Sequence, residues 1–572
     1  MKNEGKNVKA TPQKAYISTF ALIMLNVVVI AGLANDPQQA FYGLSSVTYF
    51  AIGLIVMFIP TALVAAELAS GWPQRGGIFR WVGEGIGKGW AFTCLIILWF
   101  QSTFNLGAGM PNFAATIMFF TPHYKKAIAF LNHPSHELLI MCGFLALFWF
   151  TTWLAARGTK TFSNISKYGV LIGTFIPLAA MIILTIVWLC QGNKPAIPMH
   201  AKDLIPQWNG IGTLALAAGV LFSYAGIDMN AAHIKELKHP DKQYPLSVLV
   251  AGILAFLIFV VGTLIIAMVV PAKQLNILDA LYVMMHNLGS AIHAPWLYMI
   301  LVYANFFVLV AMWITNLAGP SFMLGEAGQS GLLPKWLQNY NKHGMPSKMM
   351  YFQAFCVTII AFMVKLLPNV EGFFVMITQT VTILYLLYYV VMFIAFIRLR
   401  YTQPNRPRSF KIPGGMFGAW LVTIVGIAAC LFGIALALYP PTQVKKEVGS
   451  GTVYVVTIIA LVAVVLLVAL FLYQLSKRHN KTHHNDWVNA NNKFAPLTWE
   501  IEGMKKPTRV TSNVPTEILS SDQNPMGMPI KHSFAPDTTI NVPKNYEDHP
   551  DEYAKELRDT GKITLDPTDK EE

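Results

Sequence analysis

Residues 221–230 read LFSYAGIDMN, and they belong to an apolar run that extends from residue 209 to residue 230. About 20 apolar residues are enough for a helix to cross a lipid bilayer. Ser223, Gly226 and Asp228 interrupt this run with polar or helix-weakening positions. An acidic side chain in the middle of a span costs about 3 kcal/mol, so Asp228 is a functional candidate by default. The stretch therefore predicts a membrane helix that is broken near its centre.

A second interruption lies at residues 31–37, which read AGLANDP and close the apolar run 17–34. The two interrupted runs are the first and sixth of the chain, so the two helices cross the membrane in opposite directions. This spacing predicts two inverted repeats, helices one to five and six to ten. Broken helices at matching positions of inverted repeats predict a binding site near the bilayer midplane. The alternative is that Gly32 and Gly226 only allow close helix packing.

The whole chain is organised around such runs. Twelve apolar segments predict membrane-spanning helices, because backbone polar groups in lipid must be satisfied within the chain: 17–34, 46–66, 89–120, 138–156, 166–190, 209–230, 245–270, 296–318, 350–366, 372–397, 416–438 and 453–475. We therefore expect an all-α membrane protein with an N-terminal segment 1–16, a first repeat 17–190, a second repeat 209–397, two further helices within 416–475 and a polar tail 476–572. The segment 271–295 predicts short helices at the membrane surface.

Composition excludes a soluble enzyme or a nucleic-acid-binding protein. Of the 572 residues, 54% are hydrophobic and 12% are charged, whereas a soluble domain carries about 25% charged residues. The net charge of +13 is a topology signal. With a cytoplasmic N-terminus, 21 Lys and Arg residues of the first 476 residues fall on the inside and 8 on the outside, which fixes both termini in the cytoplasm.

Several polar side chains in or near the spans are candidate site residues. Asp228 suits a proton carrier, although it could instead cap the broken helix. Glu67, near the inner end of helix two, favours a structural or gating role through the basic loops. Gln101 and Asn105 in helix three share one helix face and either line a polar cavity or bond between helices. Further candidates could line the site or only pack within the bundle: Trp313, Asn316, Tyr385, Tyr388 and Tyr389.

Short motifs in a fixed order resemble the amino acid–polyamine–organocation transporter superfamily, in particular bacterial glutamate/gamma-aminobutyrate antiporters. The residues that carry the resemblance are Ala66–Ala69, Pro73–Trp81, Ser223–Asp228 with Lys235, Glu236, Pro240 and Tyr244–Leu246, Gly319–Ser321, Gly331–Pro334 and Phe410–Gly415. Each string is short, but together they extend over about 350 residues in the order expected for that superfamily.

The resemblance implies an alternating-access exchanger with twelve helices and a five-plus-five inverted repeat (the LeuT-like fold). It implies an amino acid bound between helices one, three, six, eight and ten. The segment Val29, Ile30, Ala31 and Gly32 would present amides to the α-carboxylate. The segment Ser223, Tyr224, Ala225 and Gly226 would present carbonyls to the amino group. Asp228 falls where those antiporters carry a glutamate linked to proton and substrate recognition, and Tyr388 where they carry a tyrosine near the site.

Three positions depart from the pattern of the glutamate/gamma-aminobutyrate antiporters. The site carboxylate is an aspartate, Phe322 replaces the arginine expected after Gly-Pro-Ser, and Met312 replaces a glutamate of helix eight. These departures leave the exchanged pair open.

The tail begins with a histidine-rich stretch, His479, His483 and His484. In acid-resistance antiporters the C-terminal segment plugs the inward path at neutral pH, and histidine is the residue type that changes charge between pH 5 and pH 8. A pH-dependent plug is one interpretation of this stretch. A membrane-proximal anchor for helix twelve is the other.

The leading hypothesis is a secondary amino acid antiporter of a bacterial inner membrane, with glutamate/gamma-aminobutyrate-like exchange and a role in acid resistance. The alternative is a proton-coupled amino acid symporter. A membrane-embedded enzyme or sensor is disfavoured, since the sequence has no HExxH, nucleotide loop or paired catalytic carboxylates. No cofactor, metal or nucleic-acid partner is expected. The partners are small amino acid substrates and the lipid bilayer, and the sequence does not indicate an oligomeric state.

Overall fold

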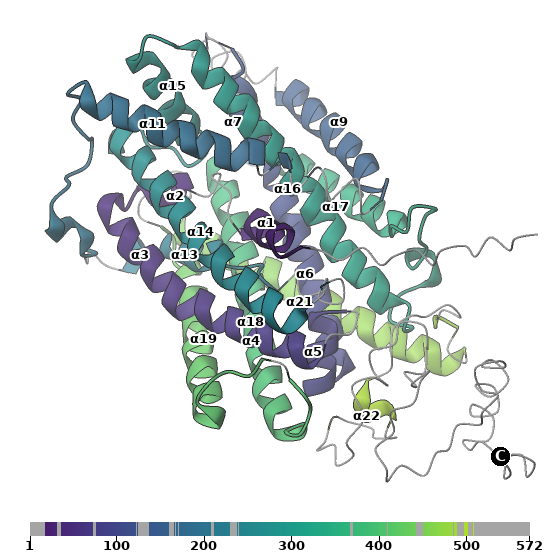
Figure 1. Ribbon diagram of the computed structural model, residues 1–572. Helices are drawn as coiled ribbons and strands as arrows, with labels where there is room; N and C mark the ends of the chain where they lie inside the picture. The colour runs from purple at the N-terminus through teal and green to yellow at the C-terminus, as the bar shows by residue number, and fades with distance from the viewer. Residues whose placement is uncertain are drawn as a thin grey trace, which may run out of the picture.

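The described residues of the computed structural model form a helical bundle (Figure 1). They are 18–30, 36–72, 76–121, 123, 137–158, 165, 168–169, 171–207, 211–228, 237, 239–365, 370–408, 410–441, 450–483, 486–488, 497–501 and 507. Among these residues there is no strand, and an isolated β-bridge joins Ser330 and Val488. The all-α class expected from the sequence is therefore confirmed for the described chain.

The first half of the chain contains α1 (Thr19–Ile30), α2 (Asp36–Ala40), η2 (Gly43–Ser45), α3 (Ser46–Gly53), η3 (Leu54–Phe58), α4 (Ile59–Gly71), α5 (Ile78–Gly85), α6 (Lys88–Gly107), α7 (Gly109–Met118), α9 (Glu137–Ala155), η4 (Leu171–Phe175), α11 (Ile176–Cys190) and η5 (Ala201–Leu204).

The second half contains α12 (Ile211–Leu214), α13 (Ala217–Ser223), α14 (Pro240–Val269), η7 (Ala272–Gln274), α15 (Ala280–Ala291), α16 (Trp296–Gly328), η8 (Lys335–Leu337), α17 (Ser347–Lys365), α18 (Val370–Thr402), α19 (Gly415–Ala437), α21 (Gly451–Thr482) and α22 (Thr498–Ile501).

Nine helices of the described residues are long and apolar enough to cross a membrane. They match nine of the twelve predicted segments, and the three that do not qualify are the first, the sixth and the ninth. The sixth is divided into the short helices α12 and α13. The described residues of the first form α1, with residues 31–35 outside the described part and α2 beyond them. The ninth contains a shorter apolar helix, Ser347–Met363. The structure therefore supports a multi-pass membrane protein but does not by itself establish twelve spans.

Two of the spans contain a π-helical segment followed by a proline. η3 precedes Pro60 at the start of α4, and η4 precedes Pro177 at the start of α11. Proline has no N–H to donate to the preceding turn, and a wider turn is a common response to such a local defect. The long helix of residues 43–71 thus stays continuous despite an internal proline.

The buried centre of the bundle is built around α6 and α18. These two helices pack against each other, α18 also packs against α19, and α1 packs against α14. The segment 271–295 contains the short helices η7 and α15. α15 lies at one end of the bundle, whereas α5 and α22 lie together at the other (Figure 1). The name "α5 end" is used below for that second end.

Candidate functional site

Helix six ends in a tight turn after α13, and two residues, Ser223 and Gly226, favour this turn. α13 ends at Ser223, whose hydroxyl donates to the carbonyl of Gly219 at 2.8 Å, within its own helix. Gly226 then adopts a φ of +108°, a conformation that residues with a Cβ rarely adopt. The chain therefore leaves the helix at residues 224–228 and turns the side chain of Asp228 toward α18.

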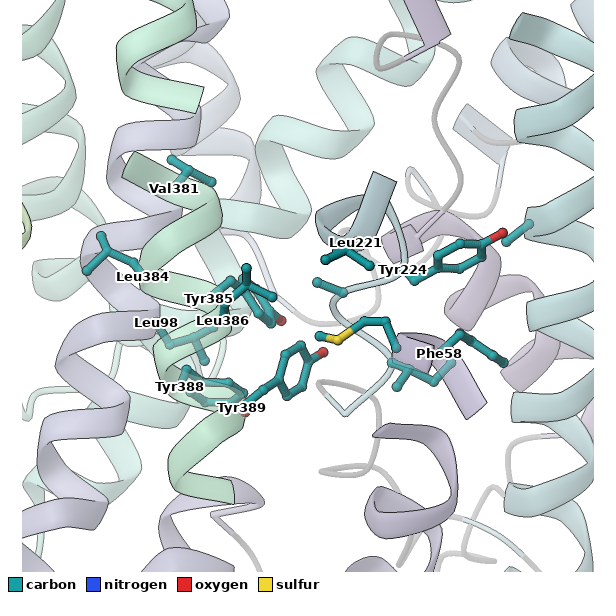
Figure 2. Close-up of a cluster of buried hydrophobic side chains, with 14 of the residues drawn as sticks. Phe58, Leu98, Leu221, Tyr224, Val381, Leu384, Tyr385, Leu386, Tyr388 and Tyr389 are labelled. Carbon is teal, nitrogen blue, oxygen red and sulfur yellow. The ribbon is translucent and has the colours of Figure 1, made fainter. Parts of the chain in front are cut away.

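Asp228 is buried, and both oxygens of its carboxylate accept hydrogen bonds from tyrosines of α18. Tyr389 donates to Oδ1 at 2.8 Å, and Tyr388 donates to Oδ2. Figure 2 shows these two rings on α18 beside Tyr385, facing the turn that follows α13. The three rings pack with centroids 5.1–5.4 Å apart.

The hydroxyl of Tyr389 also links Asp228 to the turn itself. The backbone N–H of Gly226 donates to this hydroxyl at 2.8 Å, while the hydroxyl donates to Asp228. Tyr389 is therefore shared between the carboxylate and the segment that the sequence predicts to hold substrate. In the sequence Tyr389 is only one of several candidate lining residues. Nothing in the sequence indicates that its hydroxyl makes both of these hydrogen bonds.

Tyr224 faces away from the carboxylate. Its hydroxyl donates to the carbonyl of Phe50 at 3.0 Å, and its ring packs against Phe50, Phe58 and Phe259. Figure 2 shows Tyr224 on the opposite side of the turn from Tyr388 and Tyr389. Its side chain anchors the turn to the neighbouring helices, so only its backbone, like that of buried Ala225, is available for a substrate.

The predicted residues of helices three and eight are distributed over two environments. Gln101 is buried, its Oε1 has no hydrogen-bond partner, and Asn105 is half-buried. Ser102 donates to the carbonyl of Asn316. Trp313 packs among Phe113, Phe144 and Phe148 in a separate hydrophobic cluster. The structure thus gives Trp313 aromatic partners that differ from those of the Asp228 site.

The predicted substrate segment of helix one is described only in part. Val29 and Ile30 form the last turn of α1, whereas Ala31 and Gly32 lie outside the described residues. The chain resumes at α2, and Asp36 at its first position is fully buried. Neither carboxylate oxygen of Asp36 has a hydrogen-bond partner. The sequence analysis missed this residue, although the Asp-Pro pair at 36–37 is a recognisable signal for the start of a new helix.

Glu67 anchors the loop between α18 and α19. Its carboxylate is buried and accepts hydrogen bonds from Arg408 at 2.7 Å, from Arg400 at 2.5 Å and from the backbone N–H of Ile412 at 2.8 Å. Burial lowers the pKa of Arg408, and Glu67 beside it opposes that change. This geometry supports a structural or gating role for Glu67, away from the Asp228 site.

A second buried network at the α5 end holds part of the polar tail. Glu84 forms an ion pair with Arg80 at 3.1 Å and accepts hydrogen bonds from both the backbone N–H and the hydroxyl of Thr498 at 3.0 Å. Arg406 also donates to the Thr498 hydroxyl, at 3.2 Å, and burial lowers the pKa of Arg406 to about 9. Trp499 donates to the carbonyl of Gly83 at 2.9 Å. The name "tail clasp" is used below for residues 497–501 on this surface.

The histidine-rich stretch begins on the last turn of α21, which continues to Thr482, beyond the predicted end of the span at 475. His479 and His483 stack with ring centroids 4.3 Å apart, and Trp487 stacks on His479 at 4.4 Å. The Asp486 carboxylate bonds to Lys335 at 2.5 Å, which holds its pKa below the ordinary range. His484 lies outside the described residues, as does most of the tail beyond residue 501.

Among the described residues, no three His, Cys, Asp or Glu side chains gather in a group that could hold a metal ion. The chemistry that the site offers is therefore that of carboxylates, phenols and exposed backbone groups. Such groups can bind amines and carboxylates and transfer protons.

Comparison with known proteins places this site in a family context. The family model described as amino acid permease matches residues 15–497. An uncharacterised transporter of Legionella pneumophila is 30% identical over 437 residues, which cover 75% of this chain and 91% of the relative. A glutamate/gamma-aminobutyrate antiporter of Lactococcus lactis is 28% identical over 475 residues, covering 82% and 92%.

A probable agmatine/putrescine antiporter of Lactococcus lactis is 21% identical over 407 residues, covering 70% of this chain and 83% of the relative. The matched length includes α13 with the turn that follows it and the α18 tyrosines, and it ends at residue 497, the first residue of the tail clasp. These relatives are transporters. The chain belongs to the amino acid permease family of the amino acid–polyamine–organocation superfamily, and it is a membrane transporter, not an enzyme.

Proposed function

We propose that the protein is a secondary active antiporter of a bacterial inner membrane that exchanges amino acids by alternating access, with glutamate/gamma-aminobutyrate-like exchange as the leading pair. The observation that carries the proposal is the Asp228 carboxylate, bonded by Tyr388 and Tyr389 at the interruption of helix six. The 28% identity to a glutamate/gamma-aminobutyrate antiporter over 82% of the chain supports the substrate class.

The proposed architecture has twelve membrane helices, of which the first ten form two inverted repeats, and both termini in the cytoplasm. The end of α13 at Ser223 and the turn at residues 224–228 support it. Helix breaks free backbone N–H and C=O groups at the membrane centre, where they bind charged groups of a substrate. Residues 29–32 would present N–H groups to the α-carboxylate, and residues 223–226 would present carbonyls to the amino group.

Proton coupling would act through a change in hydrogen bonding at Asp228. The ionised carboxylate only accepts hydrogen bonds, and here it accepts two from phenols. A protonated carboxyl carries one donor, so one of the two phenols would have to release its bond. If that phenol is Tyr389, its bond from the Gly226 N–H is disturbed as well. Proton binding at Asp228 would thereby reach the backbone segment proposed to hold substrate.

The inward path would be controlled at the α5 end. Glu67 joins α4 to the loop between α18 and α19, and Glu84 joins α5 to Thr498 of the tail. A tail docked across these elements can restrict their separation, which supports the pH-dependent plug suggested by His479, His483 and His484.

Exchange of this kind would serve acid resistance. Import of an amino acid and export of its decarboxylated product removes one cytosolic proton per cycle, because decarboxylation consumes a proton. The agmatine/putrescine relative favours a second candidate pair in which both substrates are amines or basic amino acids. A proton-coupled amino acid symporter is the remaining alternative.

Counterflow in proteoliposomes tests the proposal. Liposomes are loaded with one candidate amino acid or amine, and uptake of a labelled candidate is measured with and without an internal load. We expect uptake that depends on the internal substrate. Uptake that is driven by a proton gradient and does not require an internal substrate would replace antiport with symport. Absence of transport for every amino acid and amine in a broad panel would contradict the proposed function.

A further inference from the structure

The first position of α2 carries a buried carboxylate that has no hydrogen-bond partner among the described residues. Asp36 is 0% exposed, and both of its oxygens lack a hydrogen-bond partner. The buried arginines of the described residues are Arg80, Arg406 and Arg408, and all three belong to the networks at the α5 end. Buried polar groups in folded proteins are almost always hydrogen-bonded, so an exception of this kind needs an explanation.

Gln39 shows where this carboxylate points. Residues 36 and 39 are three positions apart on a helix and so share one face. The Gln39 amide donates to the carbonyl of Leu216 at 3.2 Å, next to the start of α13. The face of α2 that carries Asp36 is therefore turned toward the first half of broken helix six. The Oε1 of Gln39 is also buried and without a partner, so the same face offers a second free acceptor.

We propose that Asp36 is a second binding carboxylate of the transport site and that it takes up the ammonium group of an amine substrate, with Gln39 Oε1 as an accessory acceptor. An ammonium group donates three hydrogen bonds and carries a positive charge. No described residue beside Asp36 supplies either of these to its carboxylate. Asp36 follows the break in helix one as Asp228 follows the break in helix six, but only Asp228 has protein donors. The carboxylate of Asp36, which has no partner, is therefore the one that binds the substrate.

This inference rests on the proposed transport function and narrows it. It predicts that the exchanged pair includes an amine, such as gamma-aminobutyrate, putrescine or agmatine, and that Asp36 distinguishes this amine from amino acids whose only ammonium group lies at the α-carbon. Removal of the charge should leave the sites for the α-carboxylate and the α-amino group intact.

The test measures inhibition of counterflow by gamma-aminobutyrate, putrescine, agmatine, glutamate and alanine for the wild type and Asp36→Asn. We expect the concentration of the preferred amine that gives half-maximal inhibition to rise about tenfold or more, as loss of a charge-assisted hydrogen bond implies. The concentration of glutamate or alanine that gives half-maximal inhibition should change less than about threefold. Asp203→Asn, which removes a carboxylate of the loop before α12, is the matched control and should resemble the wild type.

Ligand-induced thermal stabilisation of the detergent-solubilised protein provides a readout that does not require transport. The amine should stabilise the wild type and Asp36→Glu, which keeps the charge, but not Asp36→Asn. Equal changes for amines and amino acids, or unchanged amine inhibition in Asp36→Asn, would overturn the inference. So would a shift confined to the pH profile, which would make Asp36 a proton site. If the wild type transports neither amines nor amino acids, the proposed function itself fails.

Discussion

Two carboxylates mark the two interrupted helices, and their surroundings are opposite. Asp228 accepts hydrogen bonds from two phenols, one of which is itself tied to the turn through Gly226. Asp36 is equally inaccessible to solvent but has no partner. The same chemical group is thus satisfied by the protein in one repeat and left unsatisfied in the other. We propose that the difference reflects separate roles, with a proton-linked group in helix six and a ligand-binding group in helix one.

The largest effect is expected for Asp228→Asn. The amide replaces one accepting oxygen with an N–H₂ donor that faces a phenol, and it cannot ionise. We expect the protein to fold and to lose proton-dependent exchange by about a hundredfold or more, or to exchange without any pH dependence. Counterflow at several pH values, with size-exclusion chromatography as the control for folding, measures this. Full, pH-sensitive transport in Asp228→Asn would remove the residue from the mechanism.

Tyr389→Phe sharpens the comparison because it makes Asp228 more like Asp36. The variant removes the donor to Oδ1 and the acceptor of the Gly226 N–H in one step. We expect the exchange rate to fall about tenfold, since one hydrogen bond to a charged group is lost while Tyr388 remains. Tyr385→Phe, a neighbouring ring that makes no bond to Asp228, is the matched control. Equal rates for the two variants would show that the Gly226 link is not used.

Deletion of residues 480–572 tests whether the tail blocks access from the cytoplasm to Asp36 and Asp228. The tail clasp bonds α5 and the loop after α18 through Thr498 and Trp499. Without it we expect transport near pH 7 to rise severalfold toward the acid rate, measured as initial uptake over pH 5–8, because the docked segment no longer restrains these elements. Trp499→Ala should give part of the increase. An unchanged pH profile in the deletion would leave the tail as an anchor only.

Another carboxylate, that of the half-buried Asp279, shows what a missing hydrogen-bond partner does outside the spans. Its Oδ1 is buried without a hydrogen bond, and burial raises the pKa of Asp279 to about 6. A raised pKa means that the folded state binds the proton more tightly than the unfolded state, so stability falls as pH rises from about 4 to about 6. Asp279→Asn should therefore be more stable than the wild type above pH 6, by at most about 3 kcal/mol.

Thermal unfolding in detergent at pH 4 and pH 7 measures this smallest effect. The difference between Asp279→Asn and the wild type should be present at pH 7 and absent at pH 4. We expect no change in amine selectivity, in contrast to Asp36→Asn. A selectivity change in Asp279→Asn would mean that an unpartnered carboxylate outside the proposed site also affects transport. The missing partner of Asp36 would then no longer be evidence that Asp36 binds the substrate.

The sequence was sufficient for most of the helices and for one half of the site. A spanning helix requires only length and hydropathy, so nine predicted segments are recovered as candidate spans. Gly226 and Asp228 were visible because a glycine and a carboxylate stand out in an apolar run. Asp36 was not, because Ala34-Asn35-Asp36-Pro37 is as typical of the end of a helix as of a break within one.

Contacts between distant segments could not be predicted. Thr498 and Glu84 are 414 positions apart, and no local pattern indicates that they meet. Tyr388 and Tyr389 adjoin in sequence, yet only packing of α18 against the turn after α13 decides that both reach Asp228. Trp313 was a candidate by composition alone, and its aromatic neighbours come from helices far away in the sequence.

The tail clasp also has a consequence for biosynthesis. Its donor, Thr498, is translated long after its acceptor, Glu84, has entered the membrane with the first helices. During synthesis the α5 end must therefore exist without its tail, in a form that resembles the unrestrained transporter. A nascent chain stalled before residue 498 would expose Glu84, Arg80 and Arg406 to water or to quality-control factors. Release of a full-length chain would be the event that both completes the fold and closes this end.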